Sequence, residues 1–374
     1  MTEWKIYRLG DIATMKYGKL PPKNNSGQYP IWSGYRNVGF TDTYNCSKGT
    51  IIVVARGVGG TGDVKIAKED CFLTNLSIAV NIDTDICLPQ YFYYKFYLSN
   101  LRYLDSGSAQ SQITIDDLKR LQISLPSLEE QRRITGILGA IDDKIENNRR
   151  INENLEQQAQ ALFDNLMSNS NLTYKLIADL DHIIETGRRP KGGVANIASG
   201  VPSIGAENIK GLGKYDYSKT KYVTAEFAEM MKKGVIKGYE LLIYKDGGKP
   251  GYFIPNFSIF GEGFPYDDMT LNEHVFLLDF GNKGYNFFAY FYMQTEEVMK
   301  YLNAQGSKAA IPGINRNDVE SISIPTIENK VVKEFCTMVE PIITSILVNS
   351  KESSRLATLR DTLLPKLMNG EIKL

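Results

Sequence analysis

Histidine and cysteine are scarce in this chain, which has two histidines and four cysteines among 374 residues. Two histidines leave almost no material for a histidine metal site or a Ser-His-Asp triad, so each is predicted to have a structural or surface role. The cysteines have no Cys-x-x-Cys spacing, which argues against a zinc knuckle or a disulfide framework and predicts reduced thiols. These residues are His182, His274, Cys46, Cys71, Cys87 and Cys336. We therefore expect no metal site and no catalytic residue.

Long apolar runs and net charge are also lacking. No run approaches the roughly 20 residues of a membrane-spanning helix, and residues 1–11 lack the apolar core of a signal peptide, so we expect a cytoplasmic protein. The 43 basic residues balance the 43 acidic residues. A free-standing DNA-binding protein is usually basic, so a nucleic-acid surface must be a local concentration of charge and the chain alone is expected to bind DNA weakly.

A glycine-rich stretch at residues 57–62 has the GxGxxG spacing of a dinucleotide-binding loop. Such a loop must open a helix, whereas residues 63–67 alternate like a strand. Residues 238–251 repeat the order of strand, basic residue and glycine-rich turn without the spacing. This comparison aligns Gly49 with Gly238 and Arg56 with Lys245. We interpret both stretches as hairpin-like turns, with a nucleotide-binding enzyme as an alternative.

The two halves of the chain repeat one another, in part at a constant shift of 201 residues. At this shift Asp117-Leu118 matches Asp318-Val319, and Leu166-Met167 matches Leu367-Met368. Other matches need small insertions: Trp4-Lys5-Ile6 with Tyr174-Lys175-Leu176, Thr74-Asn75-Leu76-Ser77-Ile78 with Leu271-Asn272-Glu273-His274-Val275, and Gly107-Ser108 with Gly306-Ser307. Each half is predicted to be an α+β globular region followed by a helix.

The helical segments carry a sustained heptad pattern at positions 134, 138, 141, 145, 148, 152, 155, 159, 162 and 166. The shift of 201 residues gives a second seam in which Arg360 is the one clear break. Asn148 and Asn349 fall at the same seam position, so we predict that the helices pack together and use buried amides to fix their register. The alternative is two amphipathic helices that each cover their own globule. Pro341 predicts that the second helix begins late or kinks.

Two motifs resemble the DNA-specificity subunit of type I restriction-modification systems, and the resemblance covers essentially the whole chain. They are Leu125-Pro126-Ser127-Leu128-Glu129-Glu130-Gln131-Arg132-Arg133-Ile134, at the entry to the first helix, and Leu363-Leu364-Pro365-Lys366-Leu367-Met368-Asn369-Gly370-Glu371-Ile372. Residues 324–330, at the entry to the second helix, lack the Glu-Gln pair.

The resemblance implies two target-recognition domains, at residues 1–125 and 169–325, and two long antiparallel coiled-coil helices, at residues 126–168 and 326–374. Each domain is expected to read one half of a split, asymmetric DNA site. The subunit itself is expected to be non-catalytic and to hold no cofactor. Its expected partners are two methyltransferase (modification) subunits, which use S-adenosylmethionine to methylate adenine, and restriction subunits, which use ATP and Mg²⁺.

The residues agree with a non-catalytic role, because the sequence has no Gly-Lys-Ser/Thr phosphate loop, no Asn- or Asp-Pro-Pro-aromatic stretch and no Glu-x-x-His pair. A duplicated unit suits a bipartite DNA site, since half-sites are spaced by helical turns of about 34–36 Å. A structural scaffold or partner-binding protein that reads no sequence is a second alternative.

Basic residues on glycine-rich loops, beside amide or aromatic side chains, are the candidates for phosphate and base contacts. In the first half these are Lys19, Lys23, Tyr35, Arg36, Arg56, Gln110 and Gln112, and in the second half Arg188, Arg189, Lys191, Lys245, Lys249 and Lys308.

Overall fold

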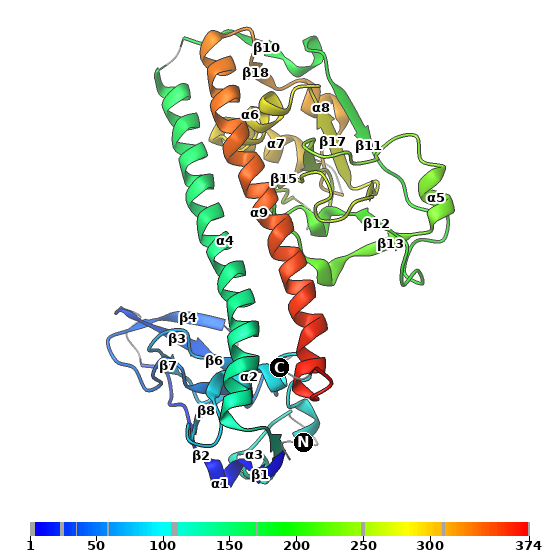
Figure 1. Ribbon diagram of the computed structural model, residues 1–374. Coiled ribbons are helices and arrows are strands. Elements are labelled where there is room, and N and C mark those ends of the chain that lie inside the picture. Colours follow the sequence, from blue (N-terminus) through cyan, green and yellow to red (C-terminus); the bar gives the residue numbers. More distant parts are fainter. Residues whose placement is uncertain are drawn as a thin grey trace. The chain divides into compact units, whose positions relative to one another are not determined.

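The chain divides into two compact units: unit 1 comprises Met1–Asp143 and Ala357–Leu374, and unit 2 comprises Lys144–Leu356. The computed structural model describes residues 4–22, 26–34, 36–57, 60–105, 111–169, 171–247, 251–308 and 311–372. Two long helices, α4 (Leu128–Asn169) and α9 (Lys330–Met368), contribute to both units (Figure 1). Among the described residues, no helix is both long and apolar enough to cross a membrane.

Unit 1 contains a four-stranded sheet of order β2-β8-β5-β6, a three-stranded sheet of order β4-β3-β7 and the pair β1-β9. The strands are β1 (Lys5–Arg8), β2 (Ala13–Tyr17), β3 (Tyr29–Ser33), β4 (Arg36–Thr41), β5 (Ile51–Val54), β6 (Val64–Ile66), β7 (Phe72–Leu73), β8 (Ser77–Ile82) and β9 (Gln122–Leu125). The helices are α1 (Leu9–Ile12), α2 (Pro89–Tyr97) and α3 (Ile115–Arg120). The aromatic residues of α2 pack in one core with β5, β8 and the first turns of α4.

Unit 2 repeats this design with sheets of order β11-β17-β14-β15 and β13-β12-β16 and the pair β10-β18. The strands are β10 (Tyr174–Leu176), β11 (Ile183–Thr186), β12 (Val201–Ile204), β13 (Lys221–Val223), β14 (Leu241–Tyr244), β15 (Phe257–Ile259), β16 (Thr270–Leu271), β17 (Val275–Asp279) and β18 (Ser323–Pro325). The helices are α5 (Ala225–Glu229), α6 (Lys283–Tyr292), α7 (Glu296–Gly306) and α8 (Arg316–Glu320). The identical strand orders confirm the α+β fold with an internal repeat.

Local details also obey the shift of 201 residues. Thr114 caps α3 and forms a reciprocal capping box with Asp117, and Asn315 caps α8 in the same way with Asp318. Each cap satisfies backbone N–H groups that the first helical turn leaves unpaired. The predicted match of Asp117 with Asp318 is therefore confirmed.

Strand register corrects the predicted match of Arg56 with Lys245. Val54 lies opposite Ser77, and Tyr244 lies opposite Val275, at the same place in the two ladders. Arg56 lies two residues after Val54, and Asp246 lies two residues after Tyr244, so Arg56 corresponds to Asp246. The predicted match with Lys245 was therefore wrong by one residue. The prediction paired Gly49 with Gly238 because both are glycines. In the structure, Tyr239 of unit 2 holds the place of Gly49, and the two residues have positive φ angles of 74° and 85°, respectively.

Two further matches are corrected for the same reason. The strand pairing aligns Ser77 with Val275 rather than with His274. The N–H of Leu9 donates to the Leu121 carbonyl in unit 1, and the N–H of Ile177 donates to the Ile322 carbonyl in unit 2. These equivalent hydrogen bonds align Leu9 with Ile177. Three residues earlier, Ile6 therefore corresponds to Tyr174 rather than to Leu176. The match of Gly107-Ser108 lies outside the described residues.

The GxGxxG stretch connects two antiparallel strands, because β5 pairs with β6 directly after it. In unit 2, β14 pairs with β15 in the same way. The antiparallel strands expected of a hairpin are confirmed on both sides of each stretch, whereas residues 58–59 and 248–250 of the two turns lie outside the described residues.

In unit 2 the long helices run antiparallel and meet through amide side chains. Asn148 Nδ2 donates to Ser353 Oγ at 3.2 Å, and Asn349 Nδ2 donates to Asn152 Oδ1 at 2.9 Å. The two contacts are related by the shift of 201 residues. This confirms that the helices pack together and that their amides specify one register.

The second helix does not begin late. α9 starts at Lys330 and continues through Pro341. At its start, the side chain of Asn329 donates to Thr326 and accepts from the N–H of Thr173, which replaces the missing Glu-Gln entry. The domain boundaries that the sequence analysis placed at 125/126, 168/169 and 325/326 remain predictions.

Candidate nucleic-acid interface

Four candidate residues of unit 1 lie around the β3–β4 hairpin. Lys19 forms a parallel bridge with Thr74, and Thr74 Oγ1 donates to Ser33 Oγ at 3.3 Å. Ser33 in turn lies opposite Arg36 in the β3–β4 ladder. These links bring Lys19 and Arg36, which are both exposed, to the same end of the small sheet, where β3 and β7 finish and β4 starts.

Arg56 and Gln112 join the same region from other segments. They face one another in an antiparallel bridge. A Cβ on Gly34, in the β3–β4 turn, would lie 3.7 Å from the Arg56 carbonyl oxygen. The structure thus brings together four residues that the sequence separates by up to 93 positions, 112 minus 19. Four other candidates lie outside the described residues: Lys23, Tyr35, Gln110 and Lys249.

Lys19 has an equivalent in unit 2, because Tyr17 lies opposite Ile78 and Thr186 lies opposite Phe276 in matching ladders. Two residues beyond Thr186 stands Arg188. Sequence reasoning selected both basic residues but missed that they correspond.

The sequence did contain a signal for this correspondence, because in both units a glycine is followed directly by a basic residue, as Gly18-Lys19 and Gly187-Arg188. Both glycines are required by close backbone approach, since a Cβ would lie 2.2 Å from the Thr74 oxygen or 1.7 Å from the Leu271 oxygen, respectively. In both units the glycine therefore fixes the position of the basic residue that follows it, at the point where the chain leaves the sheet.

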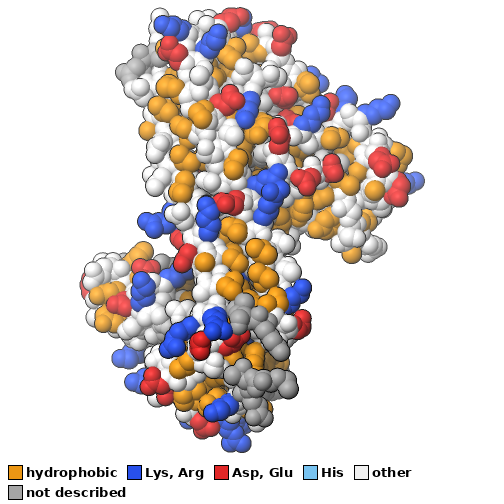
Figure 2. Space-filling model, in the orientation of Figure 1, with side chains coloured by type: hydrophobic (Ala, Val, Ile, Leu, Met, Phe, Trp, Pro, Cys, Tyr) orange, Lys and Arg blue, Asp and Glu red, His pale blue; other side chains and the backbone are white. Residues whose placement is uncertain are grey.

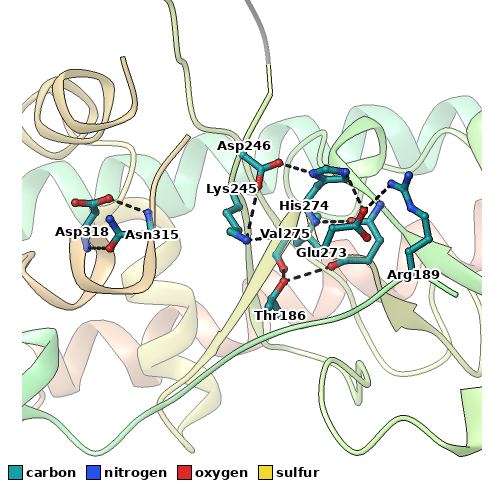
Figure 3. Close-up of polar contacts among 10 residues, drawn as sticks. Thr186, Arg189, Lys245, Asp246, Glu273, His274, Val275, Asn315 and Asp318 are labelled. Carbon is teal, nitrogen blue, oxygen red and sulfur yellow. Dashed lines mark hydrogen bonds and ion pairs between the residues drawn. The ribbon is translucent and has the colours of Figure 1, made fainter. Parts of the chain in front are cut away.

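A charged cluster surrounds the other basic candidates of unit 2 (Figure 3). Arg189 contacts Glu273 Oε1 at 3.1 Å, and the same oxygen lies 3.2 Å from His274 Nε2. His274 Nδ1 contacts Asp246, whose other oxygen lies 3.6 Å from Lys245 Nζ. Lys245 also donates to the Glu273 carbonyl at 3.1 Å. Sequence reasoning missed the acidic members, which neutralise part of the predicted basic surface.

The remaining candidates differ in setting. Arg188 donates to the Met230 carbonyl at 3.0 Å and lies over the Phe227 ring at 5.3 Å. Lys245 is half-buried over Phe276, Lys308 donates to Gln305 on α7, and Lys191 is exposed. A DNA-binding role for any of these residues stays a prediction.

The visible face carries mixed charge. In Figure 2, Lys and Arg side chains alternate with Asp and Glu rather than covering one broad area. This pattern accords with a formal net charge of zero. Among described residues, no group of three or more His, Cys, Asp or Glu is placed to hold a metal ion.

Comparison with known proteins shows one consistent similarity. The model of the type I restriction modification DNA specificity domain matches residues 1–157. The chain is 25% identical to the type I restriction enzyme MjaIX specificity subunit of Methanocaldococcus jannaschii, over 99% of this chain and 94% of that protein. It is 22% identical to the HindI specificity subunit of Haemophilus influenzae, over the full length of both.

The fold agrees with these similarities. A crystal structure of the type I restriction-modification S subunit from M. genitalium superposes with a TM-score of 0.66 at 19% identity. The match covers 98% of this chain and 96% of that chain. The chain therefore shares its fold with that S subunit, and over essentially its whole length it is similar in sequence to specificity subunits of type I restriction enzymes.

Proposed function

We propose that this chain recognises a bipartite, asymmetric DNA sequence, with one unit for each half-site. The proposal rests chiefly on the equivalence of Lys19 and Arg188, which leave matching sheets after matching glycines. A basic side chain at the same place in two copies of one fold can contact phosphate in the same way at two half-sites. Unit-specific residues around it, such as Arg56 and Asp246, can then read different bases.

The chain performs no chemistry in this proposal. Its long helices dock two methyltransferase subunits, which methylate adenine with S-adenosylmethionine, and restriction subunits join to translocate and cut DNA with ATP and Mg²⁺. The complex works in the cytoplasm on double-stranded DNA. Exposed apolar side chains on the long helices, among them Met338 at 49% and Val348 at 60% exposure, are available to partner helices.

The bipartite target can be tested in cells that carry the complete system. Sequencing of methylated adenines is expected to reveal two specified half-sites separated by unspecified bases. Cells that lack this chain serve as the control and should lose that methylation. One uninterrupted target, or methylation that persists without the chain, would contradict the proposal.

Replacing Arg188 and Arg189 with alanine is expected to weaken DNA binding and flatten its salt dependence. If both contact phosphate, the slope of log K against log salt should become shallower by up to about 1.8, at about 0.9 per phosphate. Anisotropy titrations of the complex with a modification subunit, at several salt concentrations, measure this slope.

The matched control replaces Lys300 and Arg316 with alanine, two exposed residues of unit 2 that lie outside both the candidate set and the long helices. This variant carries the same charge change and should keep the original slope. If the arginine variant also keeps it, Arg188 and Arg189 do not belong to the interface.

Two other functions have weaker support. A nucleotide-binding enzyme needs a helix after the GxGxxG stretch, and β6 stands there instead. A scaffold that reads no sequence would protect no defined DNA site in footprinting. The recurrence of Lys19 and Arg188 favours DNA recognition over both.

A further inference from the structure

Two of the four cysteines lie face to face in unit 1. Cys46 and Cys71 form an isolated antiparallel bridge in which each residue's N–H donates to the other's carbonyl, at 3.1 and 2.9 Å. Directly opposed residues in such a hydrogen-bonded pair have Cα atoms about 5.5 Å apart. Disulfides span Cα separations of about 4.4–6.8 Å, a range that includes the spacing typical of such a pair.

The two thiols also interact. The interaction between them lowers the pKa of Cys46 and raises the pKa of Cys71, which burial raises further. A thiol whose partner stabilises its thiolate is the better nucleophile of a pair. Burial instead raises the pKa of Cys87 and of Cys336 to about 12. Cys46 is thus the one cysteine of the four whose pKa is lowered, and it faces a second thiol, whereas burial disfavours the thiolates of Cys87 and Cys336.

A cavity gives small molecules a route to one member of the pair, Cys71. Cys71, although nearly fully buried, forms part of the wall of a cavity of about 670 Å³. Its wall also includes Trp32 and Tyr93, and its rim includes Lys68 and Glu69, which are exposed. A molecule the size of hydrogen peroxide can enter such a space.

We propose that Cys46 and Cys71 form a reversible disulfide when the protein meets a hydroperoxide. One thiol of the pair, as its thiolate, attacks one peroxide oxygen, which gives a sulfenic acid and releases hydroxide. The sulfur of the other cysteine then displaces the sulfenic oxygen as water and forms the S–S bond. In total two thiols and one hydrogen peroxide give one disulfide and two waters.

The bond constrains a segment next to the proposed DNA surface. Cys71 immediately precedes β7, and Thr74, just after β7, bridges Lys19 and donates to Ser33. The disulfide would close a loop from Cys46 to Cys71 and tie that segment to the chain ahead of β5. The inference concerns thiol chemistry and does not depend on the proposed function.

The full-length chain tests the proposal directly. After treatment with hydrogen peroxide and alkylation in denaturant, peptide mapping is expected to show a Cys46–Cys71 cross-link and two alkylated cysteines, Cys87 and Cys336. Cys46 and Cys71 should lose alkylation at least tenfold faster than the other two. Dithiothreitol should restore four alkylated cysteines.

Two variants sharpen the test. Cys87→Ala should still form the cross-link, whereas Cys46→Ala should leave Cys71 as slow as Cys336. The proposal is overturned if wild-type Cys46 and Cys71 remain alkylated while Cys87 or Cys336 oxidises, or if Cys46 proceeds to sulfinic acid without a cross-link. The wild-type map decides between these outcomes even if Cys46→Ala fails to fold.

Discussion

Replacing Arg360 with alanine is expected to destabilise unit 1 by about 2–4 kcal/mol, because it removes the charged partner of the partly buried Asp142 carboxylate, which keeps a hydrogen bond from Tyr94. Arg360 has 11% side-chain exposure and contacts Asp142 at 2.7 Å. Its guanidinium also lies over the Tyr97 ring at 4.5 Å. Asp142 keeps 30% exposure, which holds the expected cost below that of a fully enclosed charge. Urea unfolding followed by tryptophan fluorescence measures the loss, since Trp4 and Trp32, the two tryptophans of the chain, both belong to unit 1.

The control is Arg133→Ala, which removes an ion pair with Glu129 whose side chains are 50% and 74% exposed. Its expected cost is below about 0.5 kcal/mol. Unit 2 suggests a compensating variant, because the positions equivalent to Asp142 and Arg360 are Ile343 and Ala159, both fully buried. Asp142→Ile combined with Arg360→Ala should therefore be less destabilising than Arg360→Ala alone. Equal losses for Arg360→Ala and Arg133→Ala would show that the pair contributes little.

Replacing Gln131 with alanine is expected to cost unit 1 about 2–3 kcal/mol, because one buried amide satisfies three backbone groups. Gln131 Oε1 accepts from the Leu88 N–H at 2.9 Å. Its Nε2 donates to the carbonyls of Ile86 and Pro126, both at 3.0 Å. The side chain thus joins the start of α4 to the segment that enters α2. The same fluorescence-monitored unfolding measures the loss.

Arg132→Ala is the matched control, since the neighbouring side chain is exposed. It should change stability by less than about 0.5 kcal/mol. Gln131→Val, which installs the residue found at the equivalent position Val332, should not restore stability, because the three backbone groups would still lack partners. A Gln131→Val variant as stable as the wild type would disprove this role for the amide.

Several predictions from the sequence were confirmed because they depend on local pattern. The seam residues of the long helices recur with helical spacing, and such periodicity survives any tertiary context. The glycine-rich stretch was assigned to a hairpin because alternation after Gly62 is a property of the strand itself. The Asn148 and Asn349 contacts followed from their shared place in the repeat.

Other features were missed because they join residues far apart in the chain. Arg360 looked like a defect in the seam until the fold placed it against Asp142, 218 residues away. Gln131 was visible only as part of a family motif, and its partners lie 43 and 45 residues earlier. Arg56 was aligned with Lys245 by glycine identity, whereas the ladder aligns it with Asp246.

The sequence by itself determined the duplicated α+β architecture, the two long helices and the resemblance to type I specificity subunits, because periodicity, spacing and motif are encoded in consecutive residues. Only the tertiary structure decided which side chains face one another: Lys19 with the β3–β4 hairpin, Arg189 and Lys245 with carboxylates, and Cys46 with Cys71. Those pairings depend on strand register and chain crossing. A slip of one residue reverses the face on which a side chain lies, and local pattern does not specify that register for short, irregular strands.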